Sequence, residues 1–343
     1  MIDWISCRFT YMGPSVGDIY LKKDWQTGEI LPAWNKHVHI KGSYDAGLSV
    51  QVIGREMNLS GNVVKFLTGQ NVVGIDDLGL LIELAYEKVL QAIDLPDCLY
   101  ARKAIKNGNV NLTRVDCTFH YDVGSDDDVR TWLRAMESSV NVRYRGRGFF
   151  DEGMCSLMFG LKVKEGQKVK GSSLSSFKFY NKLTEMKKHK PTCNSQYVET
   201  LKTMATGVVR AEAMYRSKEL QTKGVKFLRD WTQETSYWLH REWIAKMEIS
   251  ANVEINSEQM KALPKKLMAV YKLWEQGNDL MELYSRSAFY RHRRQLLEYD
   301  IDIAVRREPR DDVQIIPVLR VVEAKPVHVA EGENLFYQML KAA

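Results

Sequence analysis

The sequence predicts an α+β protein in which a mixed domain of strands and helices precedes a smaller helical domain. Over residues 1–217, segments in which apolar and polar side chains alternate are interspersed with segments at helical spacing. After Ser217 the pattern becomes helical, and residues 306–343 are rich in charge, proline and valine. We therefore expect a first domain at 1–217, a helical domain at 218–305 and an extended tail at 306–343.

The first domain is expected to contain a central, mostly antiparallel sheet flanked by helices. Strand patterns lie at residues 38–43, 48–53, 110–123, 154–163, 174–180 and 207–215. Helical patterns lie at 76–93 and 125–140. The second helix has Ser125 as its expected N-cap and aspartates at 126–128 in its first turn, where the helix dipole favours negative charge.

The helical domain contains a basic helix that suits DNA. Helical patterns lie at residues 227–247, 257–277, 279–284 and 287–299. The short third helix and the fourth helix resemble a helix-turn-helix unit, with outward-facing arginines at Arg291, Arg293 and Arg294. A solvated basic helix face would have the same composition, so both readings stay open.

The composition favours a folded protein without disulfides. Hydrophobic residues make up 45% of the chain, and the net charge of 49 − 43 = +6 suits a polyanionic partner without requiring one. The five cysteines are scattered and never spaced C-x-x-C, so neither a disulfide framework nor a structural zinc site is expected. With Asp3 and Arg8 in the first apolar stretch and no long apolar run, we expect a cytoplasmic protein without a membrane segment.

Three short segments carry side chains that suggest chemistry, whereas no Walker loop, dinucleotide-binding glycine motif or H-E-x-x-H zinc motif is present. We therefore expect no nucleotide cofactor. The first segment is Thr113–His120, in which alternation places Asp116 on the strand face away from the apolar side. A carboxylate there is a hard oxygen ligand suited to Mg²⁺ or Mn²⁺, although an aspartate in a surface salt bridge would give the same pattern.

The second segment is Phe177–Glu185, where alternation places Lys178, Tyr180 and Lys182 on one side. A tyrosine flanked by lysines can attack a phosphodiester, because the ammonium groups favour the phenolate over the phenol, whose usual pKa is about 10. The same cations would neutralise the attacked phosphate. A half-buried strand tyrosine without a catalytic role is the alternative.

The third segment is Gly207–Arg216, where Arg210 and Glu212 share a strand face. Glu212 is a candidate second oxygen ligand, and Arg210 is a candidate phosphate contact. A plain cross-strand ion pair is the alternative. In addition, residues 141–150 combine glycines and aromatics with arginines at Arg143, Arg145 and Arg147, a composition that can grip a DNA backbone or form a solvated loop.

The order of these segments carries a resemblance. The chain reads L-S-G-N-V-V-K-F-L-T-G-Q-N-V-V-G at Leu59–Gly74, followed by T-R-V-D, F-K-F-Y-N-K and V-V-R-A-E. It thereby resembles the gene II type of replication-initiation proteins of filamentous phages, over residues 2–299. It is more distantly similar to rolling-circle plasmid initiators, the HUH-like nicking enzymes, which implies their palm-like antiparallel sheet.

The resemblance implies a metal-dependent endonuclease and strand transferase that nicks the plus-strand origin, stays joined to the 5′ phosphate, leaves a 3′ hydroxyl primer and later recloses the displaced strand. It places the nucleophile at Tyr180 with Lys182 following, and the Mg²⁺ or Mn²⁺ ligands at Asp116 and Glu212. His37 and His39 form the histidine pair of the wider superfamily and are further candidate ligands. Gln70 stands where relatives carry histidine.

The expected partners are double-stranded and single-stranded phage origin DNA, with a host helicase and polymerase for strand separation and synthesis. Two alternatives remain from the residues themselves. A non-catalytic origin-binding regulator would share the basic segments, and a metal-dependent nuclease using water would cut without a covalent link. Both would tolerate the loss of the Tyr180 hydroxyl.

Overall fold

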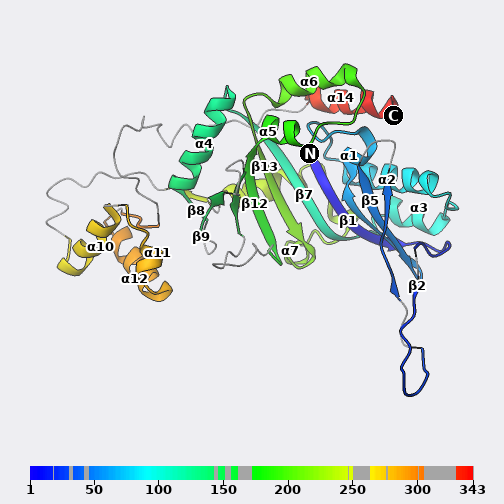
Figure 1. The fold of residues 1–343 in the computed structure, drawn as a ribbon, viewed down its shortest axis with the longest axis horizontal. Helices are drawn as coiled ribbons and strands as arrows, with labels where there is room; N and C mark the ends of the chain where they lie inside the picture. Colours follow the sequence, from blue (N-terminus) through cyan, green and yellow to red (C-terminus); the bar gives the residue numbers. More distant parts are fainter. Residues whose placement is uncertain are drawn as a thin grey trace.

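The chain folds around one large antiparallel sheet, as the computed structural model shows (Figure 1). The structure describes residues 1–17, 19–30, 34–41, 46–142, 146–150, 156–160, 172–245, 247–249, 263–275, 277–299, 301–304 and 330–342. Within them the large sheet has nine strands in the order β10-β11-β12-β13-β7-β1-β6-β5-β4. Every neighbouring pair is antiparallel. The expected α+β class with an antiparallel sheet is confirmed.

The strands of this sheet are spread over residues 2–216. They are β1 (Ile2–Thr10), β4 (Val38–Lys41), β5 (Gly47–Ile53), β6 (Glu56–Asn62), β7 (Asn111–Asp122), β10 (Phe149–Phe150), β11 (Ser156–Phe159), β12 (Ser175–Asn181) and β13 (Val208–Arg216). Strands β1 and β6 were not among the expected strands. The central position of β1 buries one of its two charged residues, Asp3, inside the sheet.

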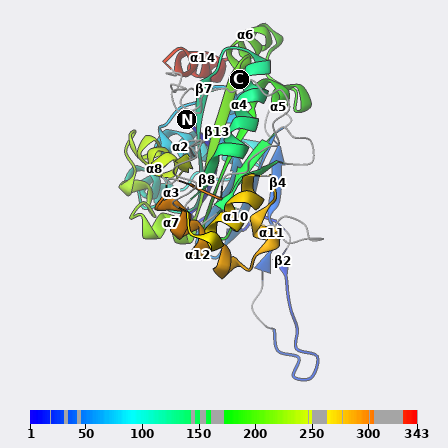
Figure 2. The ribbon, with the colours of Figure 1, turned by 90° about the vertical axis from the view of Figure 1, so that its left-hand side faces the viewer.

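Alternation gives the sheet one apolar face and one polar face. On the apolar face, Phe9 packs edge-on against Tyr86 at 5.8 Å between ring centroids, and Phe179 against Trp132 at 4.9 Å. The helices that cover this face include α2 (Leu78–Ala92), α3 (Leu99–Lys106), α4 (Asp126–Ser139) and α8 (Thr235–Ala245), which surround the sheet in Figures 1 and 2. On the polar face, hydroxyls such as those of Ser6 and Ser60 pair at 2.6 Å.

Local capping explains where the helices begin. Ser125 caps α4 as expected: its hydroxyl accepts from the Asp128 amide, and the Asp128 carboxylate accepts from the Ser125 amide. Asp77 caps α2, whereas Asp76 accepts a hydrogen bond from Ser236. The remaining short elements are α1 (Val63–Thr68), α5 (Lys182–Lys188), α6 (Ser195–Ala205), α7 (Ser217–Thr222) and a 3-10 turn (Leu228–Asp230).

A second hydrophobic core forms in the C-terminal helices. It joins α10 (Lys265–Glu275), α11 (Leu280–Leu283) and α12 (Arg286–Leu297), which stand apart from the sheet in Figure 1. Helix α8 differs from expectation. We expected it in the helical domain, but Leu239 and Trp243 are buried in the core of the sheet, because the bare apolar face needs a cover at β7 and β12. The change of core therefore lies between residues 247 and 263.

The end of the expected tail is helical rather than extended. Helix α14 (Ala330–Lys341) buries Phe336 and Met339 in the core of the sheet domain. Its apolar side chains at 335, 336, 339 and 340 follow helical spacing, so one face of the helix can pack while the other stays in solvent. Residues 305–329 lie outside the described part of the chain.

Two small sheets complete the described chain. Strands β8 (Val140–Val142), β9 (Gly146–Arg147) and β14 (Met247–Ile249) form one. Strands β2 (Ile19–Tyr20) and β3 (Trp34–Asn35) form a hairpin that projects from the molecule (Figures 1 and 2). None of the helices in the described ranges is long and apolar enough to cross a membrane.

The docking of α14 predicts a large effect of one side chain. Phe336→Ala should lower the free energy of unfolding by roughly 3–5 kcal/mol, because it removes a fully buried ring from the core. Tyr337→Ala, next to it and 39% exposed, should change stability little. Urea unfolding followed by circular dichroism measures both. Equal, small effects would mean that the C-terminal segment does not pack on the sheet.

Candidate active site

A cavity of about 340 Å³ opens on the polar face of the sheet, where β12, β13, β7 and β1 lie side by side. Four of the sequence-predicted site residues, Tyr180, Asp116, Glu212 and Lys178, line it. The other lining residues are Asp3, Trp4, Asn71, Arg114, Ser156, Glu185 and His189. Residues from distant parts of the chain thus meet in one hollow.

The strand register explains how the predicted residues come together. Lys178 on β12 lies opposite Glu212 on β13, and Tyr180 lies opposite Arg210. Glu212 in turn lies opposite Thr118 on β7. Asp116 is two residues from Thr118 and therefore faces the same side, as a diagonal neighbour of Glu212 roughly 7–8 Å away between Cα atoms.

A β-bulge brings one further carboxylate into the site. Ile2 pairs with Cys117 and Trp4 pairs with Asp116, so Asp3 is an extra residue in β1. The bulge turns the Asp3 side chain toward β13, where it forms an ion pair with the Arg210 guanidinium at 3.0 Å. Asn62 donates a second bond to Asp3 at 2.6 Å.

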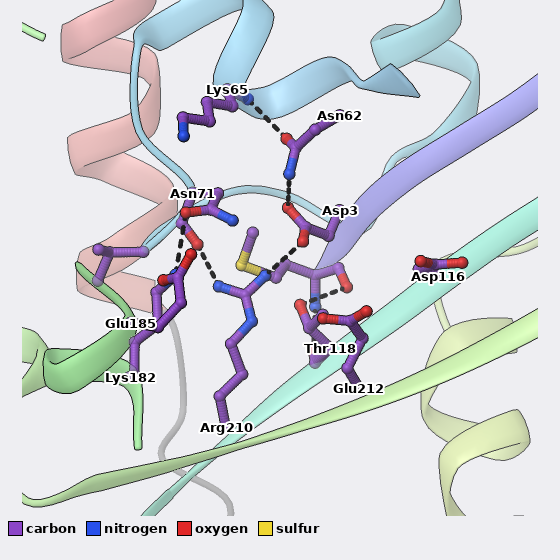
Figure 3. Close-up of polar contacts among 12 residues, drawn as sticks. Asp3, Asn62, Lys65, Asn71, Asp116, Thr118, Lys182, Glu185, Arg210 and Glu212 are labelled. Atoms are coloured by element: carbon purple, nitrogen blue, oxygen red, sulfur yellow. Dashed lines mark hydrogen bonds and ion pairs between the residues drawn. The ribbon is translucent and has the colours of Figure 1, made fainter. Parts of the chain in front are cut away.

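Arg210 is a fully buried charge of the site and contacts Asp3 and Asn71 (Figure 3). Its side chain is fully buried, and it donates to the backbone carbonyl of Asn71 as well as pairing with Asp3. The sequence analysis expected Arg210 to contact DNA. The structure contradicts that position: β13 lies in the middle of the sheet and the guanidinium is already held by protein groups.

The loop after α1 holds Asn71 where two buried cations meet it. Gln70 accepts from the amides of Val72 and Val73 at 2.7 and 3.0 Å, and it donates to the Val73 carbonyl at 3.1 Å. The loop therefore keeps one shape, and the Asn71 side chain accepts from the Lys182 ammonium at 2.9 Å. In this chain Gln70 is a structural residue of the loop.

Lys182 begins α5 and points into the protein. Its ammonium is fully buried and also donates to Glu185 at 2.6 Å. Burial, with the nearby Arg210 charge, lowers the pKa of Lys182 to about 8. For Glu185, burial acts to raise the pKa, but the contact with Lys182 outweighs it and the pKa is lowered. Lys182, which we expected to be catalytic, thus connects the end of β12 and the start of α5 to the loop that carries Asn71.

Tyr180 sits at the end of β12 with its hydroxyl on a carboxylate. The side chain is 5% exposed, the hydroxyl donates to Glu212 at 3.3 Å, and the Lys178 ammonium lies 4.9 Å from the ring centroid. Lys178 is itself ion-paired with Glu212 at 3.0 Å. Burial raises the pKa of Tyr180 well above 10, although Arg210 acts to lower it. The expectation that neighbouring cations make this phenol acidic is therefore wrong for the DNA-free protein.

Asp116 is held in an apolar setting by one arginine. Arg114 grips its carboxylate with two bonds of 2.8 and 2.5 Å and stacks on Trp4 at 4.6 Å from the ring. Burial raises the pKa of Asp116 to about 7, and the nearby carboxylates of Glu212 and Asp3 act in the same direction against Arg114. A second cation near this carboxylate would therefore be favourable.

The donor set fits a hard divalent cation. Mg²⁺ in proteins is commonly held by one or two carboxylates, with waters and substrate phosphates completing the shell. Asp116 and Glu212 line one cavity and supply two such carboxylates. Within the described ranges no group of three or more histidine, cysteine, aspartate or glutamate side chains is arranged to hold a metal by itself. The two carboxylates would therefore suit a metal ion whose remaining ligands come from water and the substrate phosphate.

The candidate histidine ligands lie elsewhere. His37 and His39 are exposed, and His39 is on β4, the strand at the far edge of the sheet. Three strands separate β4 from β7, which places His39 roughly 19 Å from Asp116 at ~4.8 Å per strand. The structure therefore does not bring the two histidines to the cavity, because β4 lies at the opposite edge of the sheet.

The expected DNA-binding arginines have different settings. Arg143 and Arg145 lie outside the described residues, and Arg147 lies in the short strand β9. On α12, Arg291 and Arg294 are exposed as expected. Arg293 instead makes two bonds to Asp302 at 2.7 and 2.6 Å, because its side of the helix faces the 301–304 segment. The N-cap of α12 is Ser285, whose hydroxyl accepts from the Ala288 amide.

Comparison with known proteins decides the family. Residues 1–234 match the family model for the N-terminal part of the phage replication-associated protein of the gene II type, and residues 255–331 match the model for its C-terminal part. The chain belongs to this gene II family. It is also 29% identical over 348 aligned positions to the replication-associated protein of the same type from Enterobacteria phage I2-2, covering 98% of both chains. No solved structure matches this chain.

Sequence reasoning missed several residues of this gene II family site. Asp3, Trp4 and Arg114 were not candidates, although a charge inside the apolar stretch at 1–10 was visible. Asn71 lies in the segment Leu59–Gly74 that carried the resemblance, and its role depends on a contact with residues more than one hundred positions away. Asp3 could have been found because it is an aspartate in an apolar, strand-like run. A carboxylate buried in such a strand needs a partner of opposite charge.

The buried ion pair predicts a stability effect. Asp3→Asn should lower the free energy of unfolding by roughly 3–5 kcal/mol, because it leaves the Arg210 charge buried without its counter-ion. As the control, Asp127→Asn breaks a surface pair with Arg130 and should stay near wild type. Urea unfolding measures both. Equal stability of Asp3→Asn and Asp127→Asn would show that the Asp3–Arg210 pair is not part of the folded core.

The raised pKa of Asp116 predicts the sign of a pH effect. Between the unfolded pKa of about 4 and the folded pKa of about 7, the folded carboxyl keeps a proton that the unfolded one has lost. The free energy of unfolding should therefore fall as pH rises through this window, by roughly 3–4 kcal/mol, relative to Asp116→Asn. Unfolding measured from pH 4 to 8 in both proteins tests this. A wild-type advantage that grows with pH would refute the assigned shift.

Proposed function

We propose that this chain initiates phage replication by nicking one strand of the origin with Tyr180 as the nucleophile. The observation that carries the proposal is the hydrogen bond from the Tyr180 hydroxyl to Glu212 inside a cavity that also holds Lys178 and Asp116. A nucleophile, a proton acceptor and a cation thus face the same space. That combination suits transfer of a phosphoryl group.

The reaction conserves the number of phosphodiester bonds. The Tyr180 oxygen attacks the scissile phosphorus while its proton passes to Glu212, which already accepts that hydroxyl hydrogen. The bond from phosphorus to the 3′ oxygen breaks, and this oxygen leaves with the bonding electrons and takes up a proton. The products are a 5′-phosphotyrosine link and a free 3′ hydroxyl, which can prime synthesis. Reversal by a later 3′ hydroxyl rejoins the strand without ATP.

The proton balance explains the role of the surrounding charges. Burial makes Tyr180 a poor acid, so ionisation needs cations placed beforehand. Arg210 lies opposite Tyr180 in the register and favours the phenolate, and Lys178 lies over its ring. Lys178 is 38% exposed and can turn from Glu212 to a bound phosphate, which would free Glu212 as the base. Lys182 positions Tyr180 through α5 and its contacts with Asn71 and Glu185.

A divalent metal, Mg²⁺ or Mn²⁺, would be held by Asp116 and Glu212 and would polarise the scissile phosphate. The Arg114 grip on Asp116 keeps that carboxylate oriented along the cavity wall. His37 and His39 do not belong to the proposed ligand set, because they lie at the far edge of the sheet. Likeness to the HUH-like nicking enzymes remains part of this proposal, supported by the open antiparallel sheet.

Origin DNA is the proposed partner of the basic elements. Arg291 and Arg294 on α12 are exposed and suit contacts with duplex phosphates. The arginines of the 141–150 segment, Arg143, Arg145 and Arg147, have the composition for the same role. Strand separation and synthesis would come from a host helicase and polymerase. The two alternatives, a non-catalytic origin-binding regulator and a nuclease using water, share these contacts but give Tyr180 no chemical role.

The proposal predicts a covalent product that depends on one oxygen. Purified protein, Mg²⁺ or Mn²⁺ and an origin strand labelled downstream of the nick should give a protein-linked band on a denaturing gel, and Tyr180→Phe should abolish it. Tyr100→Phe, at an exposed position on α3, should retain it.

The other outcomes discriminate among the alternatives. Cleavage without a linked product in both wild type and Tyr180→Phe would favour the nuclease using water. Binding without cleavage under either metal would favour the regulator. A linked product that persists in Tyr180→Phe would move the nucleophile to another tyrosine.

A further inference from the structure

The hairpin formed by β2 and β3 exposes large apolar side chains to solvent. This hairpin arm (residues 19–30 with 34–35) projects beyond the sheet in both views (Figures 1 and 2). Four of its large apolar side chains are exposed: Tyr20 at 41%, Leu21 at 61%, Trp25 at 87% and Ile30 at 62%. Trp25 is the most exposed of the four, so nearly its whole ring is available for contact with another molecule.

Trp25 is held at the tip of the arm by an ordered turn. The Asp24 carboxylate accepts from the amides of Gln26 and Thr27, both at 2.8 Å. The Asp24 amide donates to Glu29, the Gly28 amide donates back to Asp24, and Gly28 takes the left-handed conformation at φ +72°. The indole is therefore presented outward by a closed turn.

The chemistry around the tip favours a nucleic acid. Lys22 and Lys23 are exposed directly before the turn, so the arm combines two cations with a flat aromatic side chain. This pairing is typical of proteins that hold single strands, where lysines contact phosphates and aromatic rings stack on bases.

We propose that the hairpin arm binds single-stranded origin DNA, with Trp25 stacked on an unpaired base. This inference rests on the proposed function for the presence of melted origin DNA. It adds a second contact that is separate from the cavity. No described residue of the arm lines the cavity that holds Tyr180.

The fold places this contact away from the nick. Asp3 and Trp4 of the cavity lie at the start of β1, whereas the arm leaves the sheet beyond its end, beside the bridge between Val16 and Val52. The nine residues of β1 span roughly 30 Å.

The test is binding of full-length protein to a fluorescein-labelled oligothymidylate and to a labelled origin strand, by anisotropy. Trp25→Ala should weaken both by roughly 5- to 150-fold, the range seen when a stacked aromatic is truncated, since stacking tolerates any base. Trp25→Phe should lose much less. Tyr100→Ala, which removes an exposed aromatic on α3, should bind as wild type.

Two further readouts separate this proposal from the nicking proposal. At saturating DNA, Trp25→Ala should form the Tyr180-linked product in wild-type yield, because the arm is remote from the cavity. If wild type forms no such product but Trp25→Ala still binds more weakly, the nicking proposal fails and the arm proposal stands.

Two results would overturn the arm proposal. One is wild-type affinity of Trp25→Ala for both strands. The other is unchanged DNA affinity together with an altered sedimentation coefficient, which would make the arm a contact between protein chains. The unfolding midpoint of Trp25→Ala should equal that of wild type, since the indole is 87% exposed.

Discussion

The ion pair between Arg210 and Asp3 is the interaction on which the site depends. A fully buried guanidinium is costly unless its charge is compensated, and here the Asp3 carboxylate compensates the charge while the Asn71 carbonyl accepts one of its hydrogen bonds. Those groups come from β1, the loop after α1 and β13, so the pair ties three remote parts of the chain to one point. Lys182 makes the same loop contact from α5. The protein structure next to Tyr180 is therefore held together by charged contacts as well as by apolar packing.

This arrangement places opposing demands on Tyr180. Burial opposes ionisation of the phenol and of Asp116, while Arg210, Lys178 and Arg114 supply positive charge around them. In the DNA-free site the Tyr180 hydroxyl donates to Glu212, and the carboxylates of Glu212 and Asp116 are paired with Lys178 and Arg114. Incoming phosphate would compete for those cations and release the carboxylates. Under the proposed function, these pairings would keep the site inactive until DNA binds.

The sequence predicted much of the sheet and the central residues of the site. Alternation in β7, β12 and β13 was enough to put Asp116, Tyr180 and Glu212 on one face, because side-chain direction in a strand follows from spacing alone. The family was recognised from short segments and is confirmed by the family models. Capping of α4 by Ser125 followed from local chemistry and is also confirmed.

The rest depended on contacts that spacing does not encode. Asp3 enters the site through a bulge whose position is set by pairing between β1 and β7. The pKa of Tyr180 depends on burial, which no local pattern of lysines reveals. His37 and His39 matched a motif, but strand order put them at the opposite edge. Helix α14 was not expected, because the charge, proline and valine content of residues 306–343 as a whole indicated an extended tail.

The most direct test of the account is to map the residue that carries DNA. Wild-type protein would be reacted with an origin strand and a divalent metal, digested with nuclease and trypsin, and analysed by tandem mass spectrometry. The account predicts a nucleotide remnant on the phenolic oxygen of Tyr180, which sits on Glu212 in the cavity. A remnant on another tyrosine, or cleaved DNA with no modified peptide, would contradict it.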